Sequence, residues 1–154
     1  MDFAYDTTGL GASIDISIPL SLIASILTLV DTVDFSLDPI EDQEFSGLLH
    51  LLVDNGFPLS ANIQMKFLDE NGALVDTIVT ANVIQPGEVV GDRVENEVRT
   101  INTIPLDDVR FNKLANARQL IFTVIFDSGS STEYRQIYND YTIDFTITSE
   151  ILLK

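Results

Sequence analysis

Alternation of apolar and polar residues is the strongest pattern in this chain, and it predicts β-strands. In SIDISI, residues 13–18, isoleucine takes every second position and Ser or Asp the positions between. YTIDFTIT, residues 141–148, alternates Tyr, Ile and Phe with Thr and Asp. Successive side chains of a strand point to opposite faces, so both patterns are typical of strands with one buried and one solvated face.

Further strands are expected where apolar runs of strand length lie between turn residues. FSGLLHLLV, residues 45–53, is apolar on both faces and is expected to be a central strand that is covered on both sides. DENG, residues 69–72, predicts a hairpin turn with Gly72 in the left-handed conformation. The expected additional strands are residues 27–30, 45–53, 61–68, 73–79, 97–104 and 119–126.

The stretch PLSLIASILTLVDTVDFSL, residues 19–37, allows two interpretations. Ser21, Ser25 and Thr28 recur at helical spacing, which would suit the polar stripe of a helix. The same stretch also fits two extended segments, of which residues 27–30 are the second. We favour strands.

One segment, LDDVRFNKLANAR at residues 106–118, has a clear helical pattern, and a short helix is expected near residues 107–117. Asp107 is a good N-cap residue. Leu106 and Phe111 stand before and after the cap, at the positions of a hydrophobic staple.

About eight short strands at regular spacing, with this helix before the penultimate strand, predict an all-β or β-rich α+β fold. The natural arrangement is an antiparallel β-sandwich of two sheets. A chain of 154 residues suits a single domain over residues 1–154. We interpret it as a domain excised from a longer exported chain.

The segment NGFPL, residues 55–59, interrupts an otherwise continuous apolar stretch. Gly56 permits an unusual backbone angle and Pro58 removes a hydrogen-bond donor, so together they are expected to break one long strand into two. Phe57 and Leu59 would anchor the bend in the core. The alternative is an interaction site, in which Phe57 and Pro58 form an exposed aromatic tip.

Charge narrows the range of partners. The chain has 24 acidic and 8 basic residues, a formal net charge of -16, and no Lys or Arg before residue 66. A polyanion is repelled by nucleic acid and by anionic membrane surfaces, so neither is an expected partner. The charge predicts solubility or, alternatively, an acidic face for cations or for a basic partner.

The residues of common catalytic sites are scarce. The chain contains no Cys, and its single histidine, His50, stands among leucines, where a core or cross-strand role is expected. There is no GxSxG, GxGxxG or Walker sequence. We therefore expect neither an enzyme nor a cofactor, and we assign no catalytic residue.

An acidic cluster follows the first strands, with no basic residue among its members. We favour a solvated acidic loop, but calcium binds several carboxylate oxygens from flexible loops, which leaves a weak calcium site as the alternative. The candidate metal ligands are Asp31, Asp34, Asp38, Glu41 and Asp42.

Three features occur in a recognisable order. They are an apolar strand ending in the Asn55-x-x-Pro58-Leu59 break, a strand ending in FLDENG with a return beginning LVDT, and a helix ending LANARQL. Over roughly residues 45–148 this order resembles C-terminal modules of surface-associated proteins and lipoproteins of Bacteroidetes-type bacteria. The Asn-x-x-Pro-Leu element is also similar to water-stress, late-embryogenesis-abundant-like β-sandwich domains, although Asn55-Gly56-Phe57-Pro58 replaces their Asn-Pro pair. The resemblance implies an exported, modular, non-enzymatic β-sandwich.

The functional prediction is a structural or adhesive module that binds a protein partner or another copy of itself at a cell surface, in the periplasm or in an extracellular assembly. No signal peptide is visible, so a cytoplasmic location remains an alternative. No apolar stretch is long enough to span a bilayer. The alternative is a carrier or sensor of a small, lipid-like apolar ligand in a sandwich cavity. Carbohydrate binding is a third hypothesis, although the chain has no Trp and only 4 Tyr for stacking.

Overall fold

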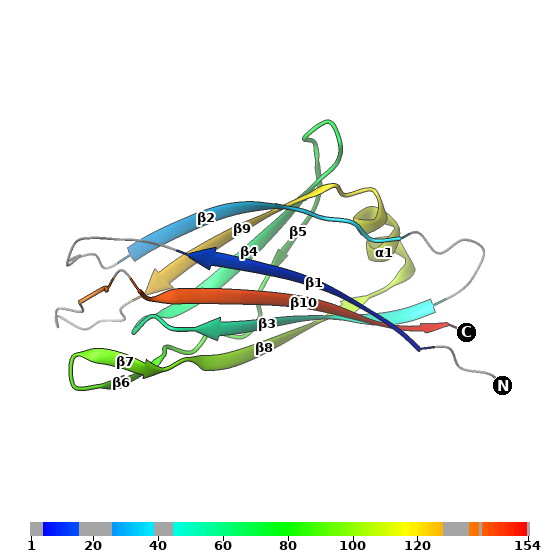
Figure 1. Ribbon diagram of the computed structural model, residues 1–154. Coiled ribbons are helices and arrows are strands. Elements are labelled where there is room, and N and C mark those ends of the chain that lie inside the picture. The colour runs from blue at the N-terminus through cyan, green and yellow to red at the C-terminus, as the bar shows by residue number, and fades with distance from the viewer. Residues whose placement is uncertain (1–4, 16–25, 39–44, 128–135, 139, 154) are drawn as a thin grey trace.

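The computed structural model describes residues 5–15, 26–38, 45–127, 136–138 and 140–153, and for residues 5–15, 26–27, 45 and 152–153 it describes the backbone alone. This part of the chain forms ten strands and one helix (Figure 1). The elements are β1 (Tyr5–Asp15), β2 (Ile26–Asp34), β3 (Phe45–Asn55), β4 (Ser60–Leu68), β5 (Leu74–Val79), β6 (Glu88–Val90), β7 (Arg93–Asn96), β8 (Val98–Leu106), α1 (Asp108–Ala115), β9 (Gln119–Asp127) and β10 (Thr142–Leu153).

Eight of the strands form two four-stranded antiparallel sheets that pack face to face. Sheet A has the order β1-β10-β3-β8 and sheet B the order β2-β9-β4-β5. The chain passes repeatedly from one sheet to the other, so most sheet neighbours are distant in sequence. This strand order is that of a jelly roll. The predicted antiparallel two-sheet sandwich of about eight strands is therefore confirmed.

The core lies between the two sheets. Along β4 and β9 every second residue is buried, as the alternating sequence requires. Aromatic rings join the layers: Phe122 of β9 stacks on Phe145 of β10 with ring centroids 4.8 Å apart. Phe35, which follows β2, meets Phe67 of β4 edge to face at 5.1 Å. Rings thus occupy the space between the sheets.

The segment after β3 is a crossover from sheet A to sheet B. Phe57 is fully buried and contacts Phe126 and Tyr141, with centroid distances of 4.8 and 5.9 Å. The expected reason for Gly56 is wrong, because its φ angle is not positive. A Cβ on Gly56 would instead lie 2.7 Å from the carbonyl oxygen of Thr142, so glycine is required by the close approach of another strand.

The expected turn and helix are both present. Gly72 has a φ of 78°, and the Asp69 carboxylate accepts the backbone N–H groups of Asn71 and Ala73. Asp107 caps α1 by accepting the N–H of Arg110 at 2.7 Å. The strand interpretation of residues 27–30 is confirmed by β2, whereas residues 16–25 lie outside the described part of the chain. Within the residues that are described, no helix has the length and apolar character needed to cross a membrane.

Candidate interaction surfaces

The outer face of sheet A carries uncharged side chains over its central strands. Leu49, Leu51 and Val53 of β3 are buried against sheet B, so the alternate residues point outward. Their cross-strand neighbours on β8 and β10 are fixed by the register, for example His50 opposite Thr103 and Thr148. We call the following set the neutral face: Leu48, His50, Leu52, Ile101, Thr103, Pro105, Thr146 and Thr148.

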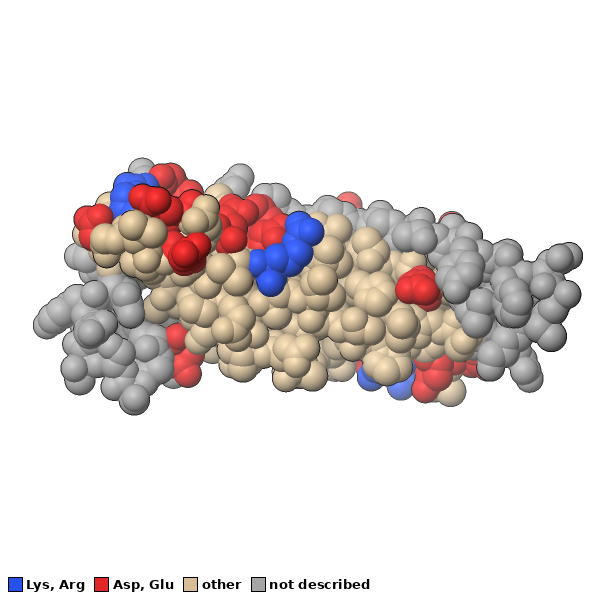
Figure 2. Space-filling view, turned by 90° about the horizontal axis from the view of Figure 1, so that it is seen from below, with Lys and Arg blue, Asp and Glu red and all other residues tan. Residues whose placement is uncertain are grey.

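Charged groups bound the neutral face at both ends of the strands. Glu150 is the cross-strand neighbour of Leu48 at one end. At the other end, Arg99 donates two hydrogen bonds of 2.8 Å to the two carboxylate oxygens of Asp54. Figure 2 looks from the side on which β3 and β8 lie in Figure 1 and shows a broad uncharged area between charged side chains. The arrangement separates an uncharged centre from charged ends.

The Asp54–Arg99 pair also changes the acidity of its carboxyl group. The hydrogen bonds from Arg99 lower the pKa of Asp54 below its ordinary value of 3.8, and partial burial opposes part of that effect. Asp54 therefore stays ionised at all but strongly acidic pH. Asp144 of β10, the cross-strand neighbour of Asp54, adds a further carboxyl group at that end of the neutral face.

His50 lies near the centre of the neutral face. Its Nδ1 atom is 3.0 Å from the Thr103 hydroxyl and its Nε2 atom 3.4 Å from the Glu150 carboxylate. The cross-strand role expected of this histidine is confirmed. The Thr103 hydroxyl and the Glu150 carboxylate belong to the two strands that flank β3, so each ring nitrogen faces a group on a different adjacent strand.

The strand at residues 45–53 is not covered on both sides within the part of the chain that is described, so that expectation was wrong. The inner residues of β3 are buried. On its outer side Leu48 is 36% exposed, and Leu52, on the same side of the strand, is only half-buried. Ile101, across the strand pair from Leu52, is 51% exposed. A two-layer fold covers one face of each sheet, whereas this sequence carries apolar residues on both faces of β3.

Sheet B has a less uniform outer face. Val30, Val79 and Ile125 are exposed there. Lys66 of β4 lies among them, opposite Ile121 of β9, and introduces a charge into the middle of the sheet. The neutral face of sheet A is therefore the larger uncharged surface formed by described side chains.

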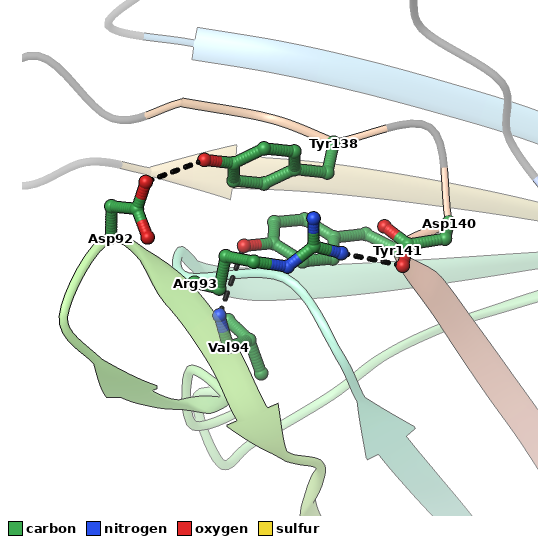
Figure 3. Close-up of polar contacts among 6 residues, drawn as sticks. All are labelled: Asp92, Arg93, Val94, Tyr138, Asp140 and Tyr141. Carbon is green, nitrogen blue, oxygen red and sulfur yellow. Dashed lines mark hydrogen bonds and ion pairs between the residues drawn. The ribbon is translucent and has the colours of Figure 1, made fainter.

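A second surface is the β6–β7 hairpin, which is held against the chain before β10 (Figure 3). The guanidinium carbon of Arg93 lies 4.1 Å from the ring centroid of Tyr138 and 6.0 Å from that of Tyr141. Its Nη2 atom pairs with Asp140. Cation–π contact and ion pairing thus fix one arginine between two rings and a carboxylate. We call this contact the hairpin latch.

Two more hydrogen bonds complete the hairpin latch. The Tyr138 hydroxyl donates to Asp92 at 2.9 Å, which raises the pKa of Tyr138. The Tyr141 hydroxyl accepts the backbone N–H of Val94 at 2.9 Å. Sequence analysis predicted no strands here, because β6 and β7 have only three and four residues. The tyrosines that hold the hairpin lie more than 40 residues away in the sequence.

A polar hollow of about 460 Å³ lies between the β4–β5 turn and the end of α1. Charges of both signs line it: Asp69 and Glu70 on one side, Lys113 and Arg118 on the other. Arg118 already donates to the carbonyl oxygens of Ala115 and Ala117 at the helix end. These contacts explain the arginine as a helix-terminal residue.

The candidate calcium ligands are only partly described. Asp31 and Asp34 both belong to β2, but their odd spacing places them on opposite faces of the strand. Asp38 is exposed beyond the strand, and Glu41 and Asp42 lie outside the described residues. Among described residues no three His, Cys, Asp or Glu side chains gather as a metal site would require. Calcium binding at the full cluster stays a prediction.

The candidate interaction residues at the crossover are placed differently from each other. Phe57 is fully buried between the sheets, whereas Pro58 is half-buried. The ring of Phe57 therefore serves the core, which is the interpretation favoured from the sequence. An interaction role for Pro58 stays a prediction.

Sequence reasoning placed Asn55 at the strand break but assigned no role to its side chain. This fully buried residue donates to the carbonyl oxygens of Leu59 and Gln85 and accepts the N–H of Phe57, each at 2.9 Å. A polar side chain at the end of an apolar strand, before a glycine and a proline, was the available signal. The contact with Gln85 was not available, because it joins segments 30 residues apart.

Comparisons with known proteins find similar folds. No family model and no curated protein matches the chain. The structure of infectious bursal disease virus, Gx strain, matches with a TM-score of 0.53 and 9% identity over 97% of this chain and 32% of that one. The VP2 subviral particle of the same virus matches with a TM-score of 0.50 and 10% identity over 96% of this chain and 32% of that one.

A bacterial protein shares the fold as well. A protein of Parabacteroides distasonis that is described as secreted matches with a TM-score of 0.56 and 18% identity, over 81% of this chain and 37% of that one. This chain thus spans about a third of the length of these structures. At such identities the likeness shows the fold alone, which this chain shares with parts of the infectious bursal disease virus structures and of the Parabacteroides distasonis protein.

Proposed function

We propose that this protein is a non-enzymatic structural module that acts through protein–protein contacts at a cell surface or in an extracellular assembly. The observation that carries the proposal is the neutral face. It presents Leu48 and Ile101 to solvent in a chain with a net charge of -16, although such a chain has ample charge with which to solvate its surface. Exposed apolar groups gathered on one face are typical of interaction sites.

The comparisons support the proposed location of this module in an extracellular assembly or at a cell surface. Particles of infectious bursal disease virus and a bacterial protein described as secreted share the sandwich fold. The bacterial neighbour agrees with the resemblance to Bacteroidetes-type surface modules. Because this chain spans about a third of each neighbour, we propose that residues 1–154 form one domain of a longer exported protein.

The carrier alternative gains no support from the packing. Phe122 and Phe145 stack at 4.8 Å where the two sheets meet, and Phe57 and Phe126 lie at the same distance. Large side chains therefore fill the interior that a lipid-like ligand would need.

Photo-crosslinking in the cells that produce the protein tests the proposal. Ile101 is replaced by p-benzoylphenylalanine, and Ile125 on the outer face of sheet B receives the same residue as the matched control, since both side chains are exposed. Ultraviolet light should give a protein adduct from position 101 and none from position 125. Absence of an adduct at position 101 would contradict a contact function for the neutral face.

A further inference from the structure

We propose that the partner of the neutral face is a second copy of this chain, which packs its own sheet A against it face to face. This inference rests on the proposed function, because it names the partner of the same surface. Two sheets stack with a spacing of about 10 Å when their facing side chains interdigitate. The dimer would therefore contain four β-layers, with the two neutral faces in the middle.

Burial is the first argument. The sequence of β3 is that of a strand covered on both sides, yet within the described residues only its inner side is covered. Leu52 and Ile101 are cross-strand neighbours on the uncovered side, and Leu48 lies on the same side beyond His50. A second sheet is the kind of surface that covers a flat, uncharged area three strands wide.

Charge distribution is the second argument, and it favours a second copy over a basic partner. Two copies that each carry a net charge of -16 repel one another wherever acidic groups approach. The neutral face has no Asp, Glu, Lys or Arg among its members, and the acidic groups of β10 on the same side, Asp144 and Glu150, stand at its borders. Its centre is therefore a surface through which two polyanions can meet. A basic partner would be drawn instead to the acidic ends, such as the hairpin with Glu88, Asp92 and Glu95.

Hydrogen-bonding capacity is the third argument. A two-fold interface brings the same patch together with itself, so its polar groups must find their partners among the members of the same patch. The polar members of the neutral face include Thr103, Thr146 and Thr148, whose hydroxyls both donate and accept. An interface of carboxylates or of ammonium groups lacks this self-complementarity.

The size of the face predicts a weak dimer. Three strands about 4.8 Å apart and seven residues of about 3.3 Å give a flat area of roughly 350 Å² per copy. Stable interfaces bury about 800 Å² per partner. We therefore expect a dissociation constant of about 0.1 mM for the dimer, so that the dimer forms where the local concentration of the protein is high.

Sedimentation velocity from 10 µM to 1 mM tests the inference, at about 50 and 500 mM NaCl. The dimer should strengthen several-fold at high salt, because salt screens the repulsion between acidic copies without weakening uncharged contacts. Ile101→Glu should raise the dissociation constant at least tenfold, since each substitution counts twice in a two-fold interface. Ile125→Glu adds the same charge to sheet B and should leave the dissociation constant close to that of the parent chain.

Three results would overturn the inference: a monomer at 1 mM in both salts, a dimer that weakens as salt rises, or a dimer lost in Ile125→Glu but kept in Ile101→Glu. Circular dichroism checks that both variants keep the fold.

A second measurement, of distances between spin labels, needs no substitution of Ile101. The chain has no native cysteine, so a spin label on Thr103→Cys reports on sheet A and one on Thr123→Cys on sheet B.

In the proposed dimer, labels at position 103 lie within roughly 30 Å of each other and labels at position 123 lie farther apart. The reverse order of distances would exclude contact through sheet A. The protein could stay monomeric in solution while position 101 crosslinks to a different protein in cells. That result would overturn the proposal that the partner is a second copy, but it would leave the proposed function standing. Absence of both dimer and adduct overturns the two together.

Discussion

Asn55 controls the crossover between the two sheets at the scale of a single residue. Its buried amide binds two carbonyl oxygens and one N–H of the segments that follow β3 and β5. Buried backbone groups need such partners, because water cannot reach them. The break in the strand is thus stabilised by a side chain as well as by Gly56 and Pro58.

Replacement of Asn55 by alanine should lower the free energy of unfolding by about 3 kcal/mol, because three buried backbone groups lose their partner. Urea denaturation with an unchanged m-value would measure the loss. Asn62→Ala, at an exposed position of the neighbouring strand β4, is the control and should cost under about 0.5 kcal/mol. Equal losses in the two variants would show that the amide network adds nothing.

Asp54 gives a prediction with a defined pH dependence. Its pKa is lowered in the folded protein by Arg99, so ionised Asp54 adds stability above about 3.8, and this contribution disappears as pH falls through the lowered pKa. Asp54→Asn should therefore lower the melting temperature by about 2 °C at pH 7. Near pH 2 the two proteins should melt together. A difference that persists or grows in acid would contradict the role of the ion pair.

At the scale of the element, the β6–β7 hairpin depends on contacts that lie outside itself. An isolated two-stranded hairpin is marginally stable in water. The hairpin latch supplies the missing support through Arg93, Tyr138 and Tyr141 (Figure 3). Local opening of the hairpin is therefore expected to be governed by the latch rather than by the core.

Arg93→Gln should make the amides of residues 88–96 exchange with solvent about tenfold faster, because the cation between the two rings is lost. Amides of β3 in the core should keep their rates. Hydrogen exchange read by mass spectrometry or NMR distinguishes the two groups. Arg99→Gln removes an exposed arginine from another ion pair and serves as the control. Uniform acceleration across the chain would mean that the latch supports the whole fold.

At the scale of the whole molecule, the neutral face of sheet A contrasts with the charged groups at its borders and in the hairpin. The jelly-roll order brings β3, β8 and β10 side by side and so assembles the neutral face from segments up to 100 residues apart. On the side seen in Figure 2 the charged side chains lie around an uncharged area. A molecule with this distribution can approach a like-charged neighbour through the neutral face of sheet A.

The net charge predicts that salt stabilises the fold. Raising NaCl from about 20 to 500 mM should increase the melting temperature by several degrees, because screening relieves the repulsion among 24 acidic residues. Differential scanning calorimetry at low protein concentration measures this without self-association. A decrease with salt would indicate that the ion pairs, such as Arg110–Asp76, outweigh the repulsion.

Much of the local structure was determined by the sequence alone. The alternation in YTIDFTIT, the DENG turn and the Asp107 cap depend on residues within a few positions of one another, and all three are present. Such features are set by backbone geometry and by short-range hydrogen bonds. The class of fold followed from the number and spacing of these strands.

Only the tertiary structure decided what lies next to what. It placed Gly56 against the backbone of Thr142 and Asn55 against Gln85, and it brought Arg93 between two tyrosines of a distant segment. It also left the outer side of β3 uncovered, although the sequence of that strand is typical of burial on both sides. Strand pairing depends on the packing of the entire core, which no short stretch of residues encodes, and the candidate contact surface arises from that pairing.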